Sequence, residues 1–241
     1  MIYLFVDTNI YLNFFDLNRH HLSKIGELVP LINKKKINLF VTQQVVDEFY
    51  RNREKKLKQT LETIKVFEPK LLNPIVRPDI QEIREIQKLL ENIERLRVQL
   101  VTKFPEQIKK KALHADRLIE KLFGAGEIIQ ISETVFSKAK KRRELGNPPG
   151  KANSNGDAIN WESLLENIPM KKDLYFITGD KDYLSPLTEA AFSVCLMQEW
   201  ERKKKSKIHY YVSLSHFLGD KFPSIKIKKE EIREEEQAMK M

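Results

Sequence analysis

Acidic residues stand where two apolar segments of the sequence end, a position at which a buried strand would give way to a loop. Asp7 directly follows the apolar residues 2–6, and Asp180 stands two positions after the segment 174–178. In a parallel sheet the carboxyl ends of the strands lie on one edge, which is where open α/β folds bind ligands. We therefore expect these two carboxylates to meet in space although they lie far apart in the sequence.

Three further acids extend this set. Asp157 opens a predicted helix four residues before Trp161, so it shares the apolar face of that helix, where a carboxylate is costly unless something pairs with it. Glu48 borders the apolar stripe of an earlier helix, and Asp182 follows Asp180 by two positions. Each acid alone has an ordinary explanation as a turn residue, a first-turn acid or an exposed side chain.

Together these acids indicate a metal site, because clustered carboxylates repel one another and stability alone gives no reason to gather them. Mg²⁺ or Mn²⁺ removes the repulsion, since hard cations take oxygen ligands. Such an ion lowers the pKa of a bound water and stabilises an in-line displacement at phosphorus. An acidic pocket in a chain of net charge +9 is the layout expected of a nuclease, whose basic surface binds the nucleic-acid backbone.

Composition narrows the class of protein further. The chain has 241 residues, of which 43 are basic and 34 acidic, and 41% are hydrophobic, so it can bury a core and is not disordered. Cys195 is the single cysteine, which excludes a disulfide scaffold and a cysteine-based zinc site. No stretch approaches the roughly 20 apolar residues of a membrane span. We expect a cytoplasmic protein with a polyanionic partner and no membrane partner.

Apolar runs and helical periods alternate along the chain, which predicts an α/β fold with a mainly parallel central sheet. The predicted strands are residues 2–6, 37–42, 174–178 and 208–214, and the helices that carry acids are residues 43–64 and 157–168. These elements place the acids just after strands and on the helices beside them.

The composition changes between the second and third predicted strands. Residues 75–145 are predicted to form a helical insertion on the α/β core, with helices at about 80–100, 105–122 and 133–145. The apolar stripe of the first helix is interpreted as core packing, with a dimer seam as the alternative. A single domain then spans residues 1–225, and residues 226–241 form a charged tail that we expect to be frayed.

Basic residues close to the acids in sequence are candidates for binding phosphate groups. Arg142, Arg143 and Lys151 precede Asp157 and would form one wall of a groove. Arg51 follows Glu48 and would form the opposite wall. The alternative interpretation of the basic helix is a solvated face. The loop at 146–152 lacks the spacing and the hydroxyl residue of a phosphate-binding loop, which argues against nucleotide hydrolysis.

The motifs that carry the acids resemble those of PIN-domain ribonucleases. The chain contains, in this order, Val6-Asp7-Thr8-Asn9, Glu48, Gly156-Asp157-Ala158 and Thr178-Gly179-Asp180-Lys181-Asp182. With the helical insertion included, the resemblance covers nearly the whole chain. It implies a three-layer α/β/α PIN-like fold with sheet order 3-2-1-4-5 and a PIN-like nuclease domain at 1–225.

The resemblance also implies an activity and assigns roles to residues. It implies a metal-dependent endoribonuclease that hydrolyses single-stranded or structured RNA, with water as the nucleophile and Mg²⁺ or Mn²⁺ as the cofactor. The acidic catalytic and metal site corresponds to Asp7, Glu48, Asp157 and Asp180, with Asp182 as an added metal ligand. Orientation of the carboxylates or of the attacking water falls to Asn9 and Thr178.

Several partners and roles are usual in such a family: RNA, a second copy in a homodimer, a protein inhibitor, and service as a toxin or defence effector. The size and the insertion of this chain depart from small toxin-type PIN domains and their small antitoxin. One alternative is a non-catalytic RNA- or protein-binding module of the same fold. Another is a phosphatase of the haloacid-dehalogenase type, but Asn9 stands where that mechanism needs a second acid.

Overall fold

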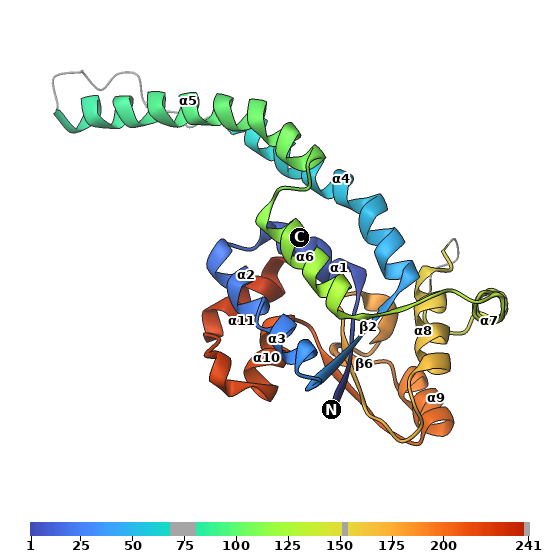
Figure 1. The fold of residues 1–241 in the computed structure, drawn as a ribbon. Helices are drawn as coiled ribbons and strands as arrows, with labels where there is room; N and C mark the ends of the chain where they lie inside the picture. Colours follow the sequence, from blue (N-terminus) through green and yellow to red (C-terminus); the bar gives the residue numbers. More distant parts are fainter. Residues whose placement is uncertain (68–80, 151–153, 239–241) are drawn as a thin grey trace. The chain divides into compact units, whose positions relative to one another are not determined.

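The computed structural model describes residues 1–67, 81–150 and 154–238, and the chain divides into two compact units. The first unit comprises Met1–Asn52 and His114–Met241, and the second comprises Arg53–Leu113. The long helix α4 (Gln43–Val66) begins in the first unit and ends in the second (Figure 1).

A five-stranded parallel sheet forms the centre of the first unit. Its strands, in spatial order, are β3 (Glu127–Ile129), β2 (Ile37–Thr42), β1 (Ile2–Val6), β4 (Leu174–Ile177) and β7 (Ile208–Tyr211). Phe5 of β1 pairs in register with Phe40 of β2 and with Phe176 of β4. Because the central strands are covered on both faces, they are continuous apolar runs rather than alternating ones. The observed order confirms the expected 3-2-1-4-5 arrangement.

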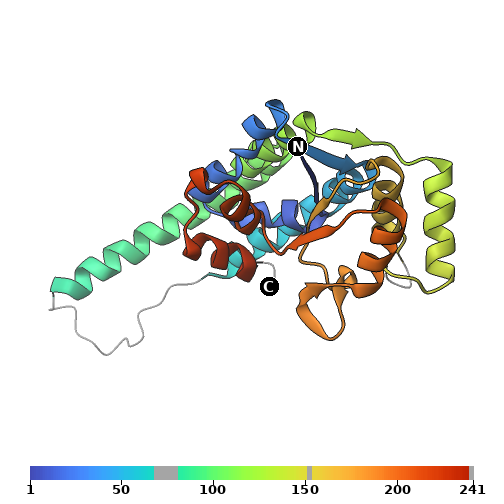
Figure 2. The ribbon, with the colours of Figure 1, turned by 90° about the horizontal axis from the view of Figure 1, so that it is seen from below.

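Helices cover both faces of this sheet and complete a three-layer α/β/α fold (Figures 1 and 2). One side carries α1 (Thr8–Asn13), α2 (Arg19–Ile25), α3 (Leu28–Asn33), α6 (His114–Ala125), α10 (Leu214–Lys221) and α11 (Lys229–Ala238). The other side carries α7 (Glu133–Glu144), α8 (Gly156–Asn167) and α9 (Val194–Lys204). Short 3₁₀ helices lie at Phe14–Asp16, Lys181–Tyr183 and Pro223–Ile225, and a two-stranded hairpin pairs β5 (Leu184–Ser185) with β6 (Thr188–Phe192).

Aromatic side chains fill the core beside the sheet and fix α8 against it. Trp161 of α8 is fully buried and lies 5.8 Å, between ring centroids, from Trp200 of α9. Phe176 of β4 lies 4.8 Å from the ring of Tyr183, which is also fully buried. This packing holds the first turn of α8 and the loop after β4 in fixed positions.

The second unit is a helical hairpin made by the end of α4 and by α5 (Gln81–Lys109). The two helices run antiparallel, because Arg53 donates to the carbonyl of Ile108 at 3.0 Å and Arg97 donates to that of Lys65 at 2.6 Å. No residue of α5 is buried. Of the apolar stripe expected to pack in a core, Ile86, Ile93, Leu96 and Leu100 are instead 40–49% exposed, and the neighbouring Leu89 is 60% exposed.

The boundaries of the insertion therefore differ from the expected 75–145. The compact second unit ends at Leu113, and the residues that follow it belong to the first unit. β3 pairs with β2, and α6 buries Leu118, Ile119 and Leu122, so neither segment could leave the main fold without exposing apolar surface. Instead of one helix at 105–122 there are two, with Pro105 inside α5 and a break after Lys109.

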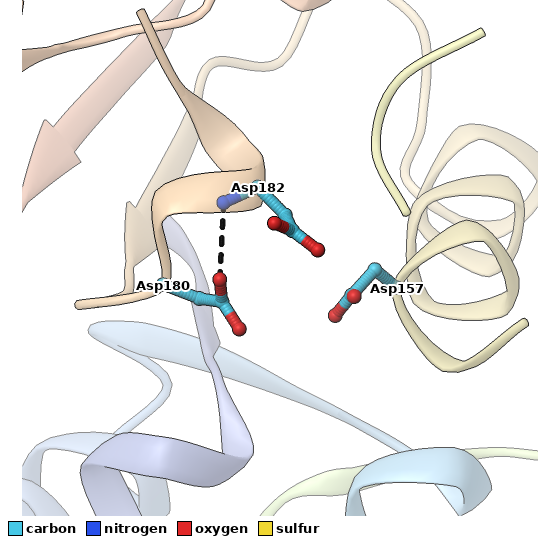
Figure 3. A group of neighbouring side chains, drawn as sticks. All are labelled: Asp157, Asp180 and Asp182. Atoms are coloured by element: carbon cyan, nitrogen blue, oxygen red, sulfur yellow. Dashed lines mark hydrogen bonds between the residues drawn. The ribbon is translucent and has the colours of Figure 1, made fainter. Parts of the chain in front are cut away.

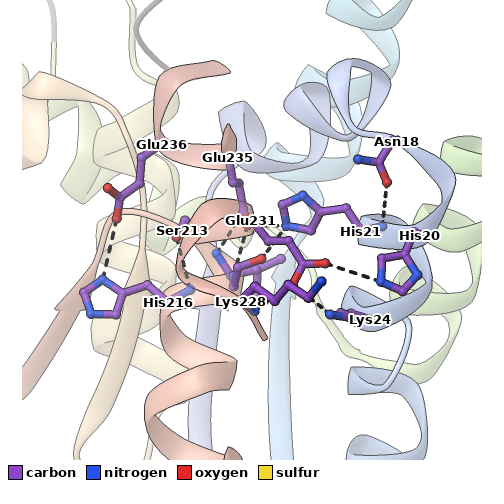
Figure 4. A network of polar contacts seen from close by, with 12 residues as sticks. Asn18, His20, His21, Lys24, Ser213, His216, Lys228, Glu231, Glu235 and Glu236 are labelled. Carbon is purple, nitrogen blue, oxygen red and sulfur yellow. Dashed lines mark hydrogen bonds and ion pairs between the residues drawn. The ribbon is translucent and has the colours of Figure 1, made fainter. Parts of the chain in front are cut away.

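The charged C-terminal segment also differs from the expected frayed tail, because residues 229–238 form the helix α11. Glu235 is 1% exposed and accepts hydrogen bonds from the backbone N–H groups of Leu214 and Ser215 at 2.9 and 3.0 Å. Lys24 pairs with Glu231 at 2.7 Å (Figure 4). The acids of this segment thus cap the start of α10 and bind α2, which holds the helix in place.

Candidate metal centre

Asp7 is fixed at the point where β1 ends. Its side chain is buried, and Oδ1 accepts a 2.7 Å hydrogen bond from the backbone N–H of Thr8, the first residue of α1. Its Oδ2 accepts from Thr178 Oγ1 at 2.6 Å and from Asn9 Nδ2 at 3.0 Å. The carboxylate therefore caps the helix that follows it and is bound at the same time to the segment after β4.

Thr178 and Asn9 connect Asp7 to the loop that carries Asp180. The hydroxyl of Thr178 accepts a 2.9 Å bond from the backbone N–H of Asp180 while it donates to Asp7. Asn9 Oδ1 accepts from the backbone N–H of Gly179 at 3.3 Å. These contacts are the ones that an orienting role of Asn9 and Thr178 requires, and they tie the ends of β1 and β4 together.

Three carboxylates meet beside this network (Figure 3). Asp180 begins the 3₁₀ helix at Lys181–Tyr183, and its Oδ1 accepts from the backbone N–H of Asp182 at 3.0 Å. Asp157 extends toward them from the first turn of α8. One carboxylate oxygen of each residue lies within 4.8 Å of those of the other two, and all three side chains are half-buried.

Glu48 approaches the site from α4. Its Oε2 lies 3.4 Å from the hydroxyl of Thr8, which donates to it. A Cβ atom added to Gly156 would lie 3.6 Å from Glu48 Oε2 and 2.9 Å from Gln44 Nε2. The glycine before Asp157 therefore lets the start of α8 come close to α4 and to the carboxylate of Glu48.

The electrostatics show that the carboxylates act on one another. Burial and the nearby charges of Asp157 and Asp180 raise the pKa of Asp7 from its ordinary 3.8 to about 8, and they outweigh the hydrogen bonds from Thr178 and Thr8, which lower it. Burial also raises the pKa of Tyr183 well above 10, with contributions from Asp157, Asp7, Asp180 and Glu48 in that order. All four predicted acids thus contribute to the field at one tyrosine.

The donor set fits a hard divalent cation. The three converging ligands of the 4.8 Å group are carboxylates, with no thiolate or imidazole among them, which suits Mg²⁺ or Mn²⁺ rather than Zn²⁺ or Cu²⁺. After burial, the charges of Asp157 and Asp180 also raise the pKa of Asp7, and a cation bound here would offset those charges. Asp7 and Glu48 lie next to this group rather than within it, and Asp182 belongs to it.

The residues predicted to bind phosphate differ in how deeply the structure buries them. Arg142 is 8% exposed and donates to Glu162 at 2.5 Å, Glu199 at 2.6 Å and the carbonyl of Pro148 at 2.6 Å. Its guanidinium is therefore already engaged inside the protein, which argues against the predicted contact with substrate. Arg143 is half-buried and Arg51 is exposed, so both remain predictions, and Lys151 lies outside the described residues.

Sequence reasoning did not single out three residues that shape the site. Gly156 gives the close approach of two helices, Thr8 binds Glu48, and the hydroxyl of Tyr183 lies 3.3 Å from the carbonyl of Asp157. A signal for Gly156 was present, since it stands directly before the predicted helix at 157–168 and glycine permits the close approach of a neighbouring group. Nothing local in the sequence indicates the other two contacts.

A parallel sheet of this order, with carboxylates gathered at the carboxyl ends of β1 and β4, defines the class to which the protein belongs. The PIN-domain family model matches residues 4–183, a range that includes all five acids, and the chain belongs to this family. PIN domains are generally nucleases that use divalent metals. No curated protein and no solved structure matches the chain. Among the described residues, no helix has both the length and the apolar character needed to cross a membrane.

Proposed function

We propose that the protein is a metal-dependent endoribonuclease that hydrolyses phosphodiester bonds of RNA with water as the nucleophile. The observation that carries the proposal is the meeting of Asp157, Asp180 and Asp182 within 4.8 Å beside the buried Asp7. Membership of the PIN-domain family supports a nuclease, and the net charge of +9 supports a polyanionic substrate.

In this proposal the three converging aspartates hold Mg²⁺ or Mn²⁺, and Asp7 and Glu48 complete the acidic site. A divalent ion bound there supplies an activated water and offsets the charge that develops on the phosphate. Thr178 and Asn9 keep the carboxylate of Asp7 in one orientation through their hydrogen bonds to Oδ2. Outer hydrogen bonds of this kind fix metal ligands and tune their basicity.

The proposal includes a biological setting. The substrate is single-stranded or structured RNA, and the cytoplasm is the compartment in which we place the activity. A role as a toxin or defence effector, with a protein inhibitor, fits a nuclease whose activity must be restrained. The exposed apolar stripe of α5 supports association of two copies, because a homodimer would cover Leu89, Ile93 and Leu96.

The test is cleavage of a fluorescent single-stranded RNA in Mn²⁺, Mg²⁺ or EDTA. We expect cleavage by the wild type with either metal, none in EDTA, and a loss of at least roughly a hundredfold for Asp7→Asn or Asp180→Asn. Asp47→Asn is the matched control, because Asp47 is the exposed neighbour of Glu48 on α4. Glu48→Gln should impair cleavage while Asp47→Asn should not.

Two results would contradict the proposal. Cleavage that persists in EDTA would remove the metal from the mechanism. No cleavage by the wild type on any RNA, together with tight RNA binding at low salt, would favour a non-catalytic RNA-binding module instead.

A further inference from the structure

Two neighbouring cavities lie along α9, apart from the acidic site. The first has a volume of about 600 Å³ and lies between α7 and α9, and the second has a volume of about 820 Å³ and lies at the end of α9. Gln198 and Arg202 line both cavities, so the two lie next to each other on α9.

The walls of the first cavity are basic. Lys138 and Lys141 come from α7, and Arg202 and Lys203 come from α9. Lys138 is engaged by Glu166 at 3.1 Å. Lys141 and Arg202 are exposed and have no acidic partner within the described part of the chain, so their charges are available to an anion.

Two acids also line this cavity, but both are already neutralised. Glu199 receives Arg142 at 2.6 Å, Lys203 at 2.8 Å and the indole N–H of Trp161 at 2.9 Å. Burial acts to raise the pKa of Glu199, yet these hydrogen bonds hold it at about 2. Glu162 is paired with the same guanidinium at 2.5 Å. The cavity therefore presents positive charge over a floor whose negative charge is compensated.

The second cavity continues the positive surface. Lys205 and Lys207 line it together with Arg202. Two acids also line it: Asp173 already accepts a 2.9 Å bond from the backbone N–H of Lys207 and lies 3.1 Å from His209 Nε2, and Glu201 is exposed. The three cations Arg202, Lys205 and Lys207 outnumber these two acids, so the second cavity adds positive charge next to the first, as binding of several phosphates requires.

Helix dipoles explain part of this pattern but not its geometry. Basic residues occupy the last turns of α7 and α9, where they stabilise the negative end of each helix. That stabilising effect does not require the two last turns to lie close to each other. Here Lys141 of one helix and Arg202 of the other line the same cavity.

We propose that these two cavities, which we call the α9 basic tract, bind the phosphodiester backbone of single-stranded RNA outside the cleavage site. The inference rests on the proposed function and adds a substrate contact to it. Helix α8 carries a residue of each site, because Asp157 in its first turn belongs to the metal centre and Glu162, five residues later, lines the first cavity. These two positions are offset by roughly 8 Å along the helix axis and by about 140° around it, so the tract and the metal centre lie on different faces of α8.

The test measures RNA affinity against salt for the full chain carrying Asp7→Asn, which keeps the RNA intact. The probe is a fluorescent oligouridylate in Mg²⁺. Lys141→Glu and Arg202→Glu should each weaken binding roughly tenfold at low salt and reduce the slope of log K against log salt by about 0.7. Lys141→Arg should restore both values. The control is the pair Lys34→Glu and Lys36→Glu, exposed lysines just before β2, a strand that β1 and β4 separate from β7.

The outcomes separate this inference from the proposed function. If the Asp7→Asn chain binds RNA but neither tract variant changes affinity or slope, the tract is overturned and the nuclease stands. If the control lysines reduce the slope as much as Lys141 and Arg202 do, binding is diffuse and the tract is again overturned. If the Asp7→Asn chain does not bind RNA, the RNA substrate fails and the tract fails with it. Circular dichroism melting confirms that each variant is folded.

Discussion

The hydroxyl of Thr178 donates a 2.6 Å hydrogen bond to Oδ2 of Asp7, across 171 positions of sequence. Oγ1 of Thr178 also accepts a hydrogen bond from the backbone N–H of Asp180. A single side chain therefore sets the orientation of one acid and the backbone position of another. It acts in the buried interior between two adjacent strand ends, where a hydrogen bond is electrostatically stronger than at the surface.

Replacing this hydroxyl should impair the site more than the fold. Thr178→Val keeps the shape of the side chain but removes both hydrogen bonds, and we expect metal affinity or cleavage to fall roughly 10–100-fold. Thr178→Ser should recover most of the activity, because it restores the hydroxyl. The measurement is the Mn²⁺ dependence of RNA cleavage. Equal activity of the valine and threonine proteins would show that the bond has no orienting role.

Asp7 should make the metal-free protein less stable as the pH rises. Its pKa is raised from 3.8 to about 8, so the folded chain retains a proton that the unfolded chain releases. Its contribution to stability is therefore greatest below about pH 4 and is lost progressively as the pH rises toward 8. Asp7→Asn removes this loss, so the variant should be the more stable protein near pH 8 in EDTA, by several kcal/mol at most, at about 1.4 kcal/mol per pKa unit.

Urea unfolding of both proteins in EDTA, at about pH 5 and about pH 8, measures this effect. The wild type should lose stability between the two values, and Asp7→Asn should lose less. Asp47→Asn, which changes an exposed acid, should follow the wild type. If Asp7→Asn destabilised the protein equally at both pH values, the carboxylate would be ionised and compensated in the metal-free fold.

Much of the site could be predicted because its acids stand directly after, or on, elements that the local sequence pattern reveals. Asp7 and Asp180 were recognisable as acids after apolar runs, and β1, β2 and β4 were visible as those runs. The edge strand β3 was not visible in this way, because it has three residues of which two are exposed. A segment so short has neither the length nor the apolar content that identifies a strand.

Contacts between distant segments account for what the sequence did not indicate. Arg142 looked like one more cation of a basic helix, but its partners Glu162 and Glu199 lie 20 and 57 positions away. The tail looked solvated because its charges are dense, yet Glu235 caps α10 from 21 positions away. In both cases charged side chains are buried because tertiary partners neutralise them, and composition alone does not identify such partners.

Gly156 should control the position of Glu48. A methyl group at this position would meet Gln44 Nε2 at 2.9 Å, so the end of that side chain must move toward its neighbours. We expect Gly156→Ala to reduce cleavage severalfold with little change in the unfolding midpoint, since Gly156 has no positive φ and alanine can take its place as the first residue of α8. The double variant Gln44→Ala/Gly156→Ala should recover activity because it removes the clash. A double variant as impaired as the single one would mean that crowding at Gln44 is not the cause.

Arg142 should contribute to stability and not to RNA binding. Arg142→Met leaves Glu162 and Glu199 buried without their shared guanidinium, which should cost about 3–5 kcal/mol of unfolding free energy. The pKa of Glu199, which is about 2 in the wild type, should rise toward its ordinary 4.5 in the variant. The wild type loses the stability from this ionised group as the pH falls from about 4.5 to about 2, whereas the variant should lack that stability already at neutral pH. Arg143→Met is the matched control on the next residue and should change stability by no more than about 0.5 kcal/mol. Urea unfolding measures the cost, and the salt slope of RNA binding measures substrate contact. A stable Arg142→Met protein with a reduced slope would return Arg142 to the phosphate-binding role that its sequence suggested.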